Sequence, residues 1–300
     1  MARRGLVTAP DQRPADPAVP TVRIVGGGRA GGSFARALAA RGWAVDGPIG
    51  RGDVVRDAAA GVELVLICVP DAQVASVGAS IEPSPTTVIA HVAGSLGLDV
   101  LASHPRTASV HPLVSLPDPE TGALRLLDAA AFAVAGDAMA KRVVESLGGR
   151  FVPVPDASRA LYHAAACVAS NHLVALLGQA ERIAAHAGVP FEMYADLIRG
   201  SVDNALTLGP ARALTGPAAR GDEATIARHL AALDPLERAG YRALAAEARR
   251  LAGREDADDS SAADGSSAAD GSSATDGSSA TDGSAPTRAA DRSTPHPEER

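Results

Sequence analysis

The sequence is short of several residue types, and each shortage excludes a kind of chemistry. Lysine occurs once in 300 residues, at Lys141, so chemistry that depends on a lysine is confined to that position. Cysteine occurs twice, at Cys68 and Cys167, each inside an apolar segment and without the spacing of metal ligands. We therefore expect two buried thiols in a reducing compartment, and no metal site.

The sequence also lacks a net positive charge and long apolar runs. The formal net charge is −7, and the sequence has no basic stripe to neutralise phosphates, which argues against a nucleic-acid partner. No run approaches the length of a membrane span, so we expect no membrane segment. Residues 1–20 are proline-rich without the apolar core of a signal peptide, and predict a disordered lead-in. These features predict a soluble, cytoplasmic protein.

The most informative motif lies in residues 21–41, where a β-branched run is followed by glycines and then by apolar residues at helical spacing. The glycines satisfy G-x-G-x-x-G at a strand-to-helix junction, the context in which this pattern indicates dinucleotide binding. The first allows a tight turn, the second lets backbone approach a pyrophosphate, and the third lets helix and strand pack closely. The free N–H groups of the helix would face the phosphates. The predicted contacts are Gly26, Gly28, Arg29, Ala30 and Gly31.

The end of the second strand, predicted over 43–49, bears on the choice between NADP and NAD. An acidic residue there binds the ribose 2′-hydroxyl of NAD, whereas an arginine suits the 2′-phosphate of NADP. The candidates are Asp46, Arg51 and Asp53. Asp46 falls inside the predicted strand, while Arg51 lies in a Gly-Arg-Gly loop at its end. We therefore favour NADP, with NAD as the alternative.

Further apolar runs alternate with helical patterns and predict a doubly wound parallel α/β sheet over residues 21–155. The predicted strands are 62–69, 87–92, 108–110, 132–135 and 150–154, with helices at 72–79 and 138–147. The run 62–69 ends at the carboxyl edge of the sheet, where ligands of such folds bind. Val69, Pro70 and Asp71 therefore join the predicted cofactor contacts.

From residue 156 onward the pattern is helical, and we expect an all-helical domain over 156–253. Residues 157–187 predict one helix that is apolar almost all round, which indicates burial within that domain or in a homodimer interface. Shorter helices are predicted at 191–202, 223–233 and 235–251, with Asp222 as an N-cap. Residues 254–300 carry SSAADG and SSATDG hexads without apolar positions, and predict a disordered tail.

Hydride transfer to a carbonyl requires a proton donor, and the composition excludes a lysine from the helical domain. Histidine is the natural substitute at neutral pH. His111 precedes a proline at the end of a short strand, and His163 lies on the long helix. Cys167 and Asn171 follow His163 at four-residue steps, so His163 and Asn171 could face one cleft. The alternative for each histidine is a satisfied structural side chain.

Two further side chains are candidates for substrate contacts. Ser95 follows a predicted strand in a Gly-Ser turn and could donate to a carbonyl, although an ordinary turn serine is equally consistent. Arg220 lies in the loop TGPAARGD between helices and could clamp a substrate carboxylate. It could equally lock the loop or a dimer.

The motifs VRIVGGGRAGGSFARAL, LICVPD, HVAGSLGLDVL, SVHPLVSL, LYHAAACVASNHLVALL and ALTGPAARGDEATIARHLAAL resemble one family over residues 22–253. It is the Rossmann-like oxidoreductases with a C-terminal domain of unknown function 2520. The resemblance implies an NADP-type nucleotide domain, followed by a helical dimerisation domain like that of 6-phosphogluconate dehydrogenase relatives. More distantly, GSLG and HPL resemble motifs of prephenate dehydrogenases, which would put Ser95 and His111 at catalytic positions. The arginines that prephenate binding requires are not evident.

Asn171 resembles the long-helix asparagine of ketopantoate and hydroxyisobutyrate reductases, with Cys167 in place of their lysine. The resemblance therefore implies an NADP-dependent reductase of a small 2-oxo acid, with ketopantoate, in pantothenate synthesis, as the leading substrate. One alternative is a dehydrogenase of another substrate: prephenate- or arogenate-like, an imine, or deazaflavin-linked. Another is a non-catalytic dinucleotide-binding protein.

Overall fold

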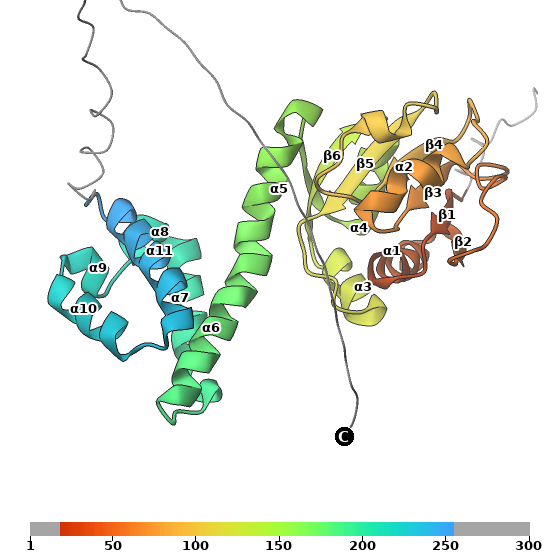
Figure 1. The fold of residues 1–300 in the computed structure, drawn as a ribbon. Coiled ribbons are helices and arrows are strands. Elements are labelled where there is room, and N and C mark those ends of the chain that lie inside the picture. Colours follow the sequence, from red (N-terminus) through yellow and green to blue (C-terminus); the bar gives the residue numbers. More distant parts are fainter. Residues whose placement is uncertain (1–18, 255–300) are drawn as a thin grey trace, which may run out of the picture. The chain divides into compact units, whose positions relative to one another are not determined.

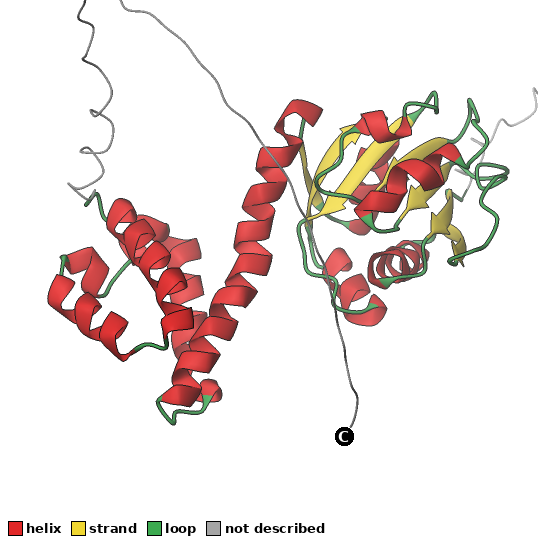
Figure 2. Ribbon diagram, in the orientation of Figure 1, coloured by secondary structure: helices red, strands yellow, loops and turns green. Residues whose placement is uncertain are grey.

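The computed structural model describes residues 19–254, which form two compact units divided between Ala195 and Asp196 (Figure 1). The first contains a sheet and its helices, and the second is built of helices (Figure 2). The predicted lead-in, apart from its last two residues, and the hexad repeats lie outside the described residues.

The first unit is organised around a seven-stranded sheet in the order β2-β1-β3-β4-β5-β6-β7. Its strands are β1 (Thr21–Val25), β2 (Ala44–Ile49), β3 (Leu64–Ile67), β4 (Val88–His91), β5 (Thr107–Pro112), β6 (Ala131–Gly136) and β7 (Arg150–Pro153). All neighbours are parallel except β5 and β6, which are antiparallel. The predicted α/β architecture is confirmed, with the last two strands reversed relative to the first five.

Helices cover both faces of this sheet, as a doubly wound fold requires. On one face, α1 (Arg29–Ala40), α3 (Pro119–Leu127) and α4 (Met139–Leu147) bury side chains with alternate residues of the strands. On the other, α2 (Asp71–Ala79) and the 3₁₀ turn η1 (Leu98–Leu101) pack against Val65, Ile67 and Ile89. The central strands are thus buried on both faces, which is why they read as continuous apolar runs.

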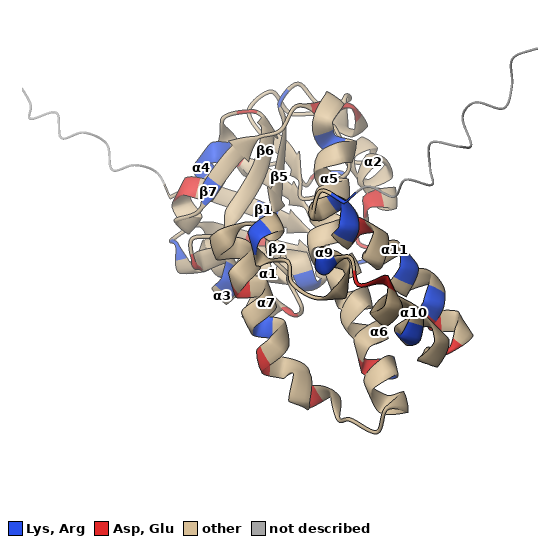
Figure 3. Cartoon of the chain, turned by 90° about the vertical axis from the view of Figure 1, so that its left-hand side faces the viewer, with Lys and Arg blue, Asp and Glu red and all other residues tan. Residues whose placement is uncertain are grey.

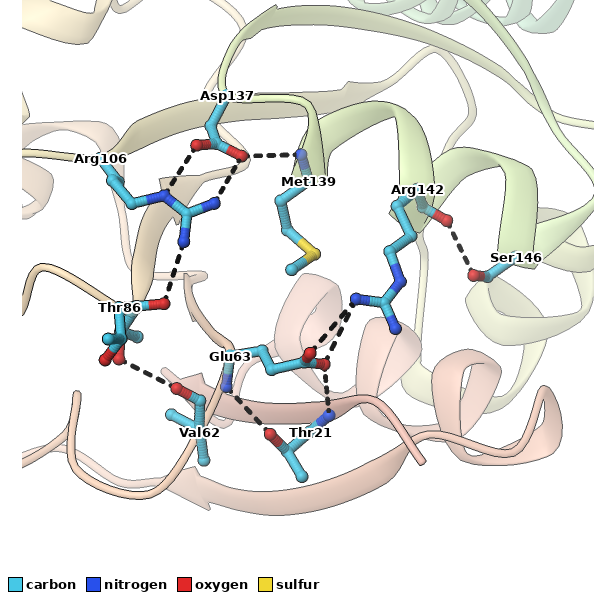
Figure 4. A network of polar contacts seen from close by, with 10 residues as sticks. Thr21, Val62, Glu63, Thr86, Arg106, Asp137, Met139, Arg142 and Ser146 are labelled. Atoms are coloured by element: carbon cyan, nitrogen blue, oxygen red, sulfur yellow. Dashed lines mark hydrogen bonds and ion pairs between the residues drawn. The ribbon is translucent and has the colours of Figure 1, made fainter. Parts of the chain in front are cut away.

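A polar network joins the amino ends of the strands, opposite the edge where ligands of this fold bind (Figure 4). The carboxylate of Glu63 accepts from the backbone N–H of Thr21 and from Arg142, at 3.3 Å each. Arg106 donates to both carboxylate oxygens of Asp137, at 3.0 and 3.2 Å. These groups are saturated by one another, so they hold the sheet together rather than forming a site.

Residues 156–186 form one helical run in the first unit (Figure 1). It comprises η2 (Asp156–Ser158), α5 (Arg159–Cys167), a π-helical turn η3 (Val168–His172) and α6 (Leu173–His186). Within residues 19–254 this run alone is long and apolar enough to cross a membrane, and none of its most apolar window is buried. That corrects the expectation that no stretch approaches this length. Core and interface helices of soluble proteins have the same length and composition, so the finding by itself is weak evidence for a membrane span.

A 3₁₀ turn, η4 (Phe191–Tyr194), ends the first unit, and the second follows with α7 (Ala195–Leu208). Its other helices are α8 (Pro210–Ala213), α9 (Pro217–Arg220), α10 (Glu223–Ala232) and α11 (Pro235–Leu251). The carboxylate of Asp222 accepts from the backbone N–H of Thr225, which confirms the predicted N-cap. Basic and acidic positions are mixed over α10 and α11 (Figure 3).

Candidate functional site

The glycine turn between β1 and α1 contains one position with room for a ligand. Gly26 has φ +106°, and a Cβ there would lie 2.6 Å from the carbonyl oxygen of Cys68. A Cβ on Gly31 would lie 1.8 Å from the carbonyl oxygen of Gly26. Both glycines are therefore required by the fold. A Cβ on Gly28 would have no atom within 4 Å, so the fold makes no steric demand for glycine at this position.

The surroundings of Gly28 suit the pyrophosphate of a dinucleotide. Gly28 is the N-cap of α1, so backbone N–H groups and the positive end of the helix dipole face the space beside it. Arg29 and Ala30 form the first turn, which has no acidic residue. Val69, Pro70 and Asp71 follow β3, the neighbouring strand, at the same edge. The described residues therefore fit a dinucleotide in the way the motif predicts.

The loop after β2 contains one arginine available to a ligand. Asp46 lies within β2 and forms an ion pair of 2.6 Å with Arg23. The carboxylate of Asp53 accepts from the backbone N–H of Gly50 at 2.8 Å and so closes the loop. Arg51 is exposed and makes no hydrogen bond or ion pair with any residue in 19–254. Of the three candidates for the ribose end of a dinucleotide, Arg51 is thus the uncommitted one.

On β5, three strand positions from β1, His111 is joined to the long helix. Its Nδ1 lies 2.6 Å from the hydroxyl oxygen of Tyr162 on α5, and the two rings meet edge to face. The ring of His163 lies 5.9 Å away, also at an edge. One sheet residue and two consecutive helix residues therefore form a cluster, and all three side chains are half-buried.

The environment of His111 keeps its imidazole neutral. Burial, then the neighbouring His163 and the charge of Arg159, lower the pKa of His111 to about 4. At neutral pH the ring therefore carries one proton. If the Tyr162 hydroxyl donates to Nδ1, that proton is on Nε2, which makes no hydrogen bond with residues 19–254. Nε2 is then a hydrogen-bond donor that a ligand can use.

The loop after β4 approaches this cluster closely at Gly94. A Cβ on Gly94 would lie 2.7 Å from Nε2 of His111 and 2.5 Å from Cδ2 of His163. Only glycine lets the backbone pass this close to both rings. The next residue, Ser95, donates from Oγ to the carboxylate of Asp71 at 2.7 Å. Ser95 and Asp71, predicted for different roles, are therefore paired at the carboxyl edge.

The other predicted residues of the helices are Cys167, Asn171 and Arg220. Sγ of Cys167 lies 3.8 Å from Nδ1 of His163, as four-residue helical spacing predicts. The π-helical turn begins at Val168 and breaks that spacing, so Asn171 leaves the row. Asn171 is exposed and its Oδ1 accepts from Ser170. Arg220 ends α9 in the second unit and is exposed. The roles proposed for Asn171 and Arg220 stay predictions.

Tyr162 is a site residue that sequence reasoning missed, although it precedes His163 in the segment LYHAAA. A tyrosine on an apolar helix carries no signal of its own. Its partner is 51 positions away, and only the docking of α5 on the sheet brings the two together.

The fold is a Rossmann-like α/β unit followed by helices, and solved structures share it. Residues 130–248 match the family described as Domain of unknown function (DUF2520). A comparison with the curated proteins finds no match.

Solved structures share the fold at low sequence identity. A Bacteroides fragilis protein provisionally named an NADP oxidoreductase aligns with TM-score 0.65 at 19% identity, over 77% of this chain and 98% of its own. A Thermotoga maritima protein aligns with TM-score 0.61 at 22% identity, over the same shares. Pyrroline carboxylate reductase of Plasmodium falciparum, with NADP bound, aligns with TM-score 0.51 at 12% identity, over 78% and 98%.

Proposed function

We propose that the chain is an NAD(P)-dependent oxidoreductase that reduces the carbonyl group of a small 2-oxo acid. The observation that carries the proposal is the combination of two features at the carboxyl edge of the sheet. Gly28 is open at the N-terminus of α1, and His111 is neutral, with an Nε2 that has no hydrogen-bond partner among residues 19–254. A bound nicotinamide would supply the hydride. The chain itself has to bind, orient and protonate the substrate.

The low pKa of His111 assigns different tasks to the two histidines. With a pKa of about 4, only about one His111 ring in a thousand is protonated at pH 7, so it is a poor source of a proton. Its Nε2–H instead donates to the substrate oxygen and stabilises the negative charge that develops there. His163, beside it, is then the general acid. Tyr162 is a positioning residue that holds the tautomer of His111.

The substrate we propose is ketopantoate, reduced to pantoate in pantothenate biosynthesis, with Ser95 and Asn171 orienting the carbonyl. The sequence resemblance supports this choice. An imine is the second candidate, because the structures similar to this chain include a pyrroline carboxylate reductase and a reductive aminase from Aspergillus terreus complexed with NADPH. The same donor pair could protonate an imine nitrogen.

For the cofactor we propose NADP rather than NAD. Arg51 is exposed and uncommitted at the end of β2, whereas Asp46 and Asp53 are engaged by Arg23 and by the Gly50 amide. A guanidinium group there can bind the 2′-phosphate in bidentate fashion.

The test is the oxidation of NADPH, followed by its absorbance, with 2-oxo acids including ketopantoate and with cyclic imines. NADH is run in parallel. We expect turnover of a 2-oxo acid with NADPH that His163→Ala abolishes, while His111→Ala retains a measurable fraction. Turnover of imines alone would make the substrate an imine rather than a 2-oxo acid. Failure to bind either nucleotide would refute the proposal.

We also propose that the chain forms a cytoplasmic homodimer through its long helix. Leu161, Val168 and Val174 on that helix are exposed, between 59% and 79%. Its first turns are held to the sheet by Tyr162, which is inconsistent with a place across a bilayer. A second copy could cover these side chains. Light scattering should give twice the monomer mass for the wild type and the monomer mass for Val168→Arg, and a monomeric wild type would refute the dimer.

A further inference from the structure

Arg159, the first residue of α5, is a fully buried charge without a partner. Its exposure is 2%, and Nε and both Nη atoms make no hydrogen bond within residues 19–254. Removing a guanidinium from water is expensive unless hydrogen bonds or an opposite charge replace the lost hydration. A group in this state therefore indicates a missing partner.

Two other buried polar atoms, on the central strands, are also unsatisfied within residues 19–254. They are Nδ1 of His91, at the end of β4, and Oγ of Ser109, on β5. The two residues are paired in the parallel register of these strands, so their side chains point to the same face. Nε2 of His91 donates to the carbonyl of Gly97, and both His91 and His111 lie within electrostatic reach of Arg159. We call Arg159, Ser109 and His91 the inner recess.

The three residues of the inner recess share their elements or their sheet face with the candidate site. Tyr162 and His163 follow Arg159 by three and four positions, so the three side chains lie on one face of α5. His111 follows Ser109 by two residues on β5, so both side chains project to the face of the sheet that also carries His91. The half-buried rings of His111, Tyr162 and His163 form the outer part of the site.

One acidic residue lies within electrostatic reach of Arg159 without forming an ion pair with it. Asp156 lies one helical turn before Arg159, but its carboxylate accepts from the backbone N–H of Leu98 at 2.9 Å. No ion pair joins it to Arg159 in the described part of the chain. Within the described residues, the guanidinium of Arg159 therefore keeps no hydrogen-bond partner, and Ser109 supplies a free hydroxyl donor.

The phosphates of a dinucleotide are poorly placed to fill it. They would lie beside Gly28, after β1, whereas Ser109 is on β5, three strand positions away, or roughly 14 Å. A carboxylate is a better match, because its planar oxygens fit the guanidinium fork and its single charge balances that of one arginine.

We propose that Arg159 and Ser109 form a carboxylate-binding site that holds the acid group of the substrate beside the carbonyl at His111. The role given to the carbonyl rests on the proposed function, whereas binding of the carboxylate does not. The site replaces Arg220, suggested by sequence, as the principal partner of the acid group.

The test uses oxamate, a carboxylate that resembles a 2-oxo acid but is not reduced, with its neutral counterpart oxamide as the control ligand. Binding to the full chain is measured by calorimetry, with and without NADPH. The variants are Arg159→Met, Arg159→Lys, Ser109→Ala and Arg220→Met. Arg36→Met, on the exposed side of α1, is the matched control. Thermal unfolding of each variant is recorded in parallel.

We expect oxamate, but not oxamide, to bind the wild type and Arg36→Met. Loss of a charged hydrogen-bonding partner should weaken oxamate binding at least about tenfold in Arg159→Met, and less in Arg159→Lys and Ser109→Ala. Because the unliganded guanidinium has no partner, Arg159→Met should unfold at a temperature no lower than the wild type.

Three results would overturn this site: no binding of oxamate by the wild type, equal binding by Arg159→Met, or equal binding by Ser109→Ala together with misfolding of Arg159→Met. Inorganic phosphate bound more tightly than oxamate, in an Arg159-dependent way, would overturn the carboxylate assignment. Oxamate binding without turnover of any 2-oxo acid supports the site and refutes the reductase. Turnover of a 2-oxo acid with an unchanged KM in Arg159→Met would support the reductase and refute the site.

Discussion

Nδ1 of His111 and the hydroxyl oxygen of Tyr162 lie 2.6 Å apart, which links the end of β5 to the start of the long helix. This hydrogen bond holds the ring of His111 in an orientation that directs Nε2 toward Gly94. In a neutral imidazole, the group bonded to one nitrogen decides what the other nitrogen can do. The role proposed for His111 therefore depends on Tyr162.

Tyr162→Phe tests that dependence. Removing the hydroxyl leaves the ring packing in place but frees the tautomer of His111, so we expect kcat to fall about tenfold, with little change in KM. Steady-state kinetics over a range of pH measures both. A larger effect on KM than on kcat would instead make Tyr162 a substrate contact.

The low pKa of His111 makes stability depend on pH in a defined window. The native pKa of about 4 lies below the unfolded value of about 6.5, so the unfolded chain binds the proton more readily between these values. Stability from this group is complete above pH 6.5 and is lost as the pH falls toward 4, by about 3 kcal/mol at most. Burial also lowers the pKa of His91, which adds a loss of the same sign.

Urea unfolding of the wild type and His111→Gln between pH 7 and pH 4 checks this. The variant keeps a polar side chain but cannot take up the proton, so its free energy of unfolding should fall less over this range. Parallel curves for the two proteins would contradict the assignment of the low pKa to His111. The depressed carboxyl pKa values of Asp118 and Asp137 act at the acid end of the range and are common to both proteins.

Gly94→Ala should damage the site while leaving the fold intact. The added methyl would lie within 2.7 Å of both histidine rings, so the loop or the rings must move. We expect a loss of about 1–3 kcal/mol in stability and a much larger proportional loss of activity. Gly200→Ala is the matched control, because a Cβ there meets nothing within 4 Å and alanine favours the helix. Full activity in Gly94→Ala would show that the histidines need not hold this geometry.

Much of the sheet could be read from the sequence because its central strands are buried on both faces. Leu64–Ile67 and Val88–His91 are buried at every position, and all their residues except the terminal His91 are apolar. Helix α3 was missed although Asp118 caps it and Pro119 opens it, a pair that marks a helix start. Its burial depends on contact with α1 at Gly32 and Ser33, which the local pattern does not reveal.

The candidate site could be predicted in part, because the sequence reveals local geometry but not the packing of distant segments. Local geometry indicates four of its residues. The tight turn predicts Gly26, Gly28 and Gly31, and the strand end predicts His111. Arg159 reads as an ordinary helix-surface arginine, and only the docking of α5 on the sheet shows that it is buried. The π-helical turn at Val168–His172 likewise shifts Asn171 in a way that a regular helical count cannot anticipate.

The glycine turn gives a contrast that separates folding from binding. Gly28→Ala adds a methyl with no protein atom within 4 Å, so the unfolding temperature should stay close to that of the wild type. The methyl would nevertheless project into the space beside the N-terminus of α1. There it would keep a phosphate from the backbone N–H groups and weaken NADPH binding about 10- to 100-fold.

Gly31→Ala should behave in the opposite way. Its methyl would lie 1.8 Å from the carbonyl oxygen of Gly26, so β1 and α1 must separate and the protein should lose stability before any ligand is added. Thermal unfolding and NADPH titration of both variants measure the contrast. If Gly28→Ala binds NADPH as tightly as the wild type, the pyrophosphate does not lie at this turn, because a ligand there could not avoid the added methyl.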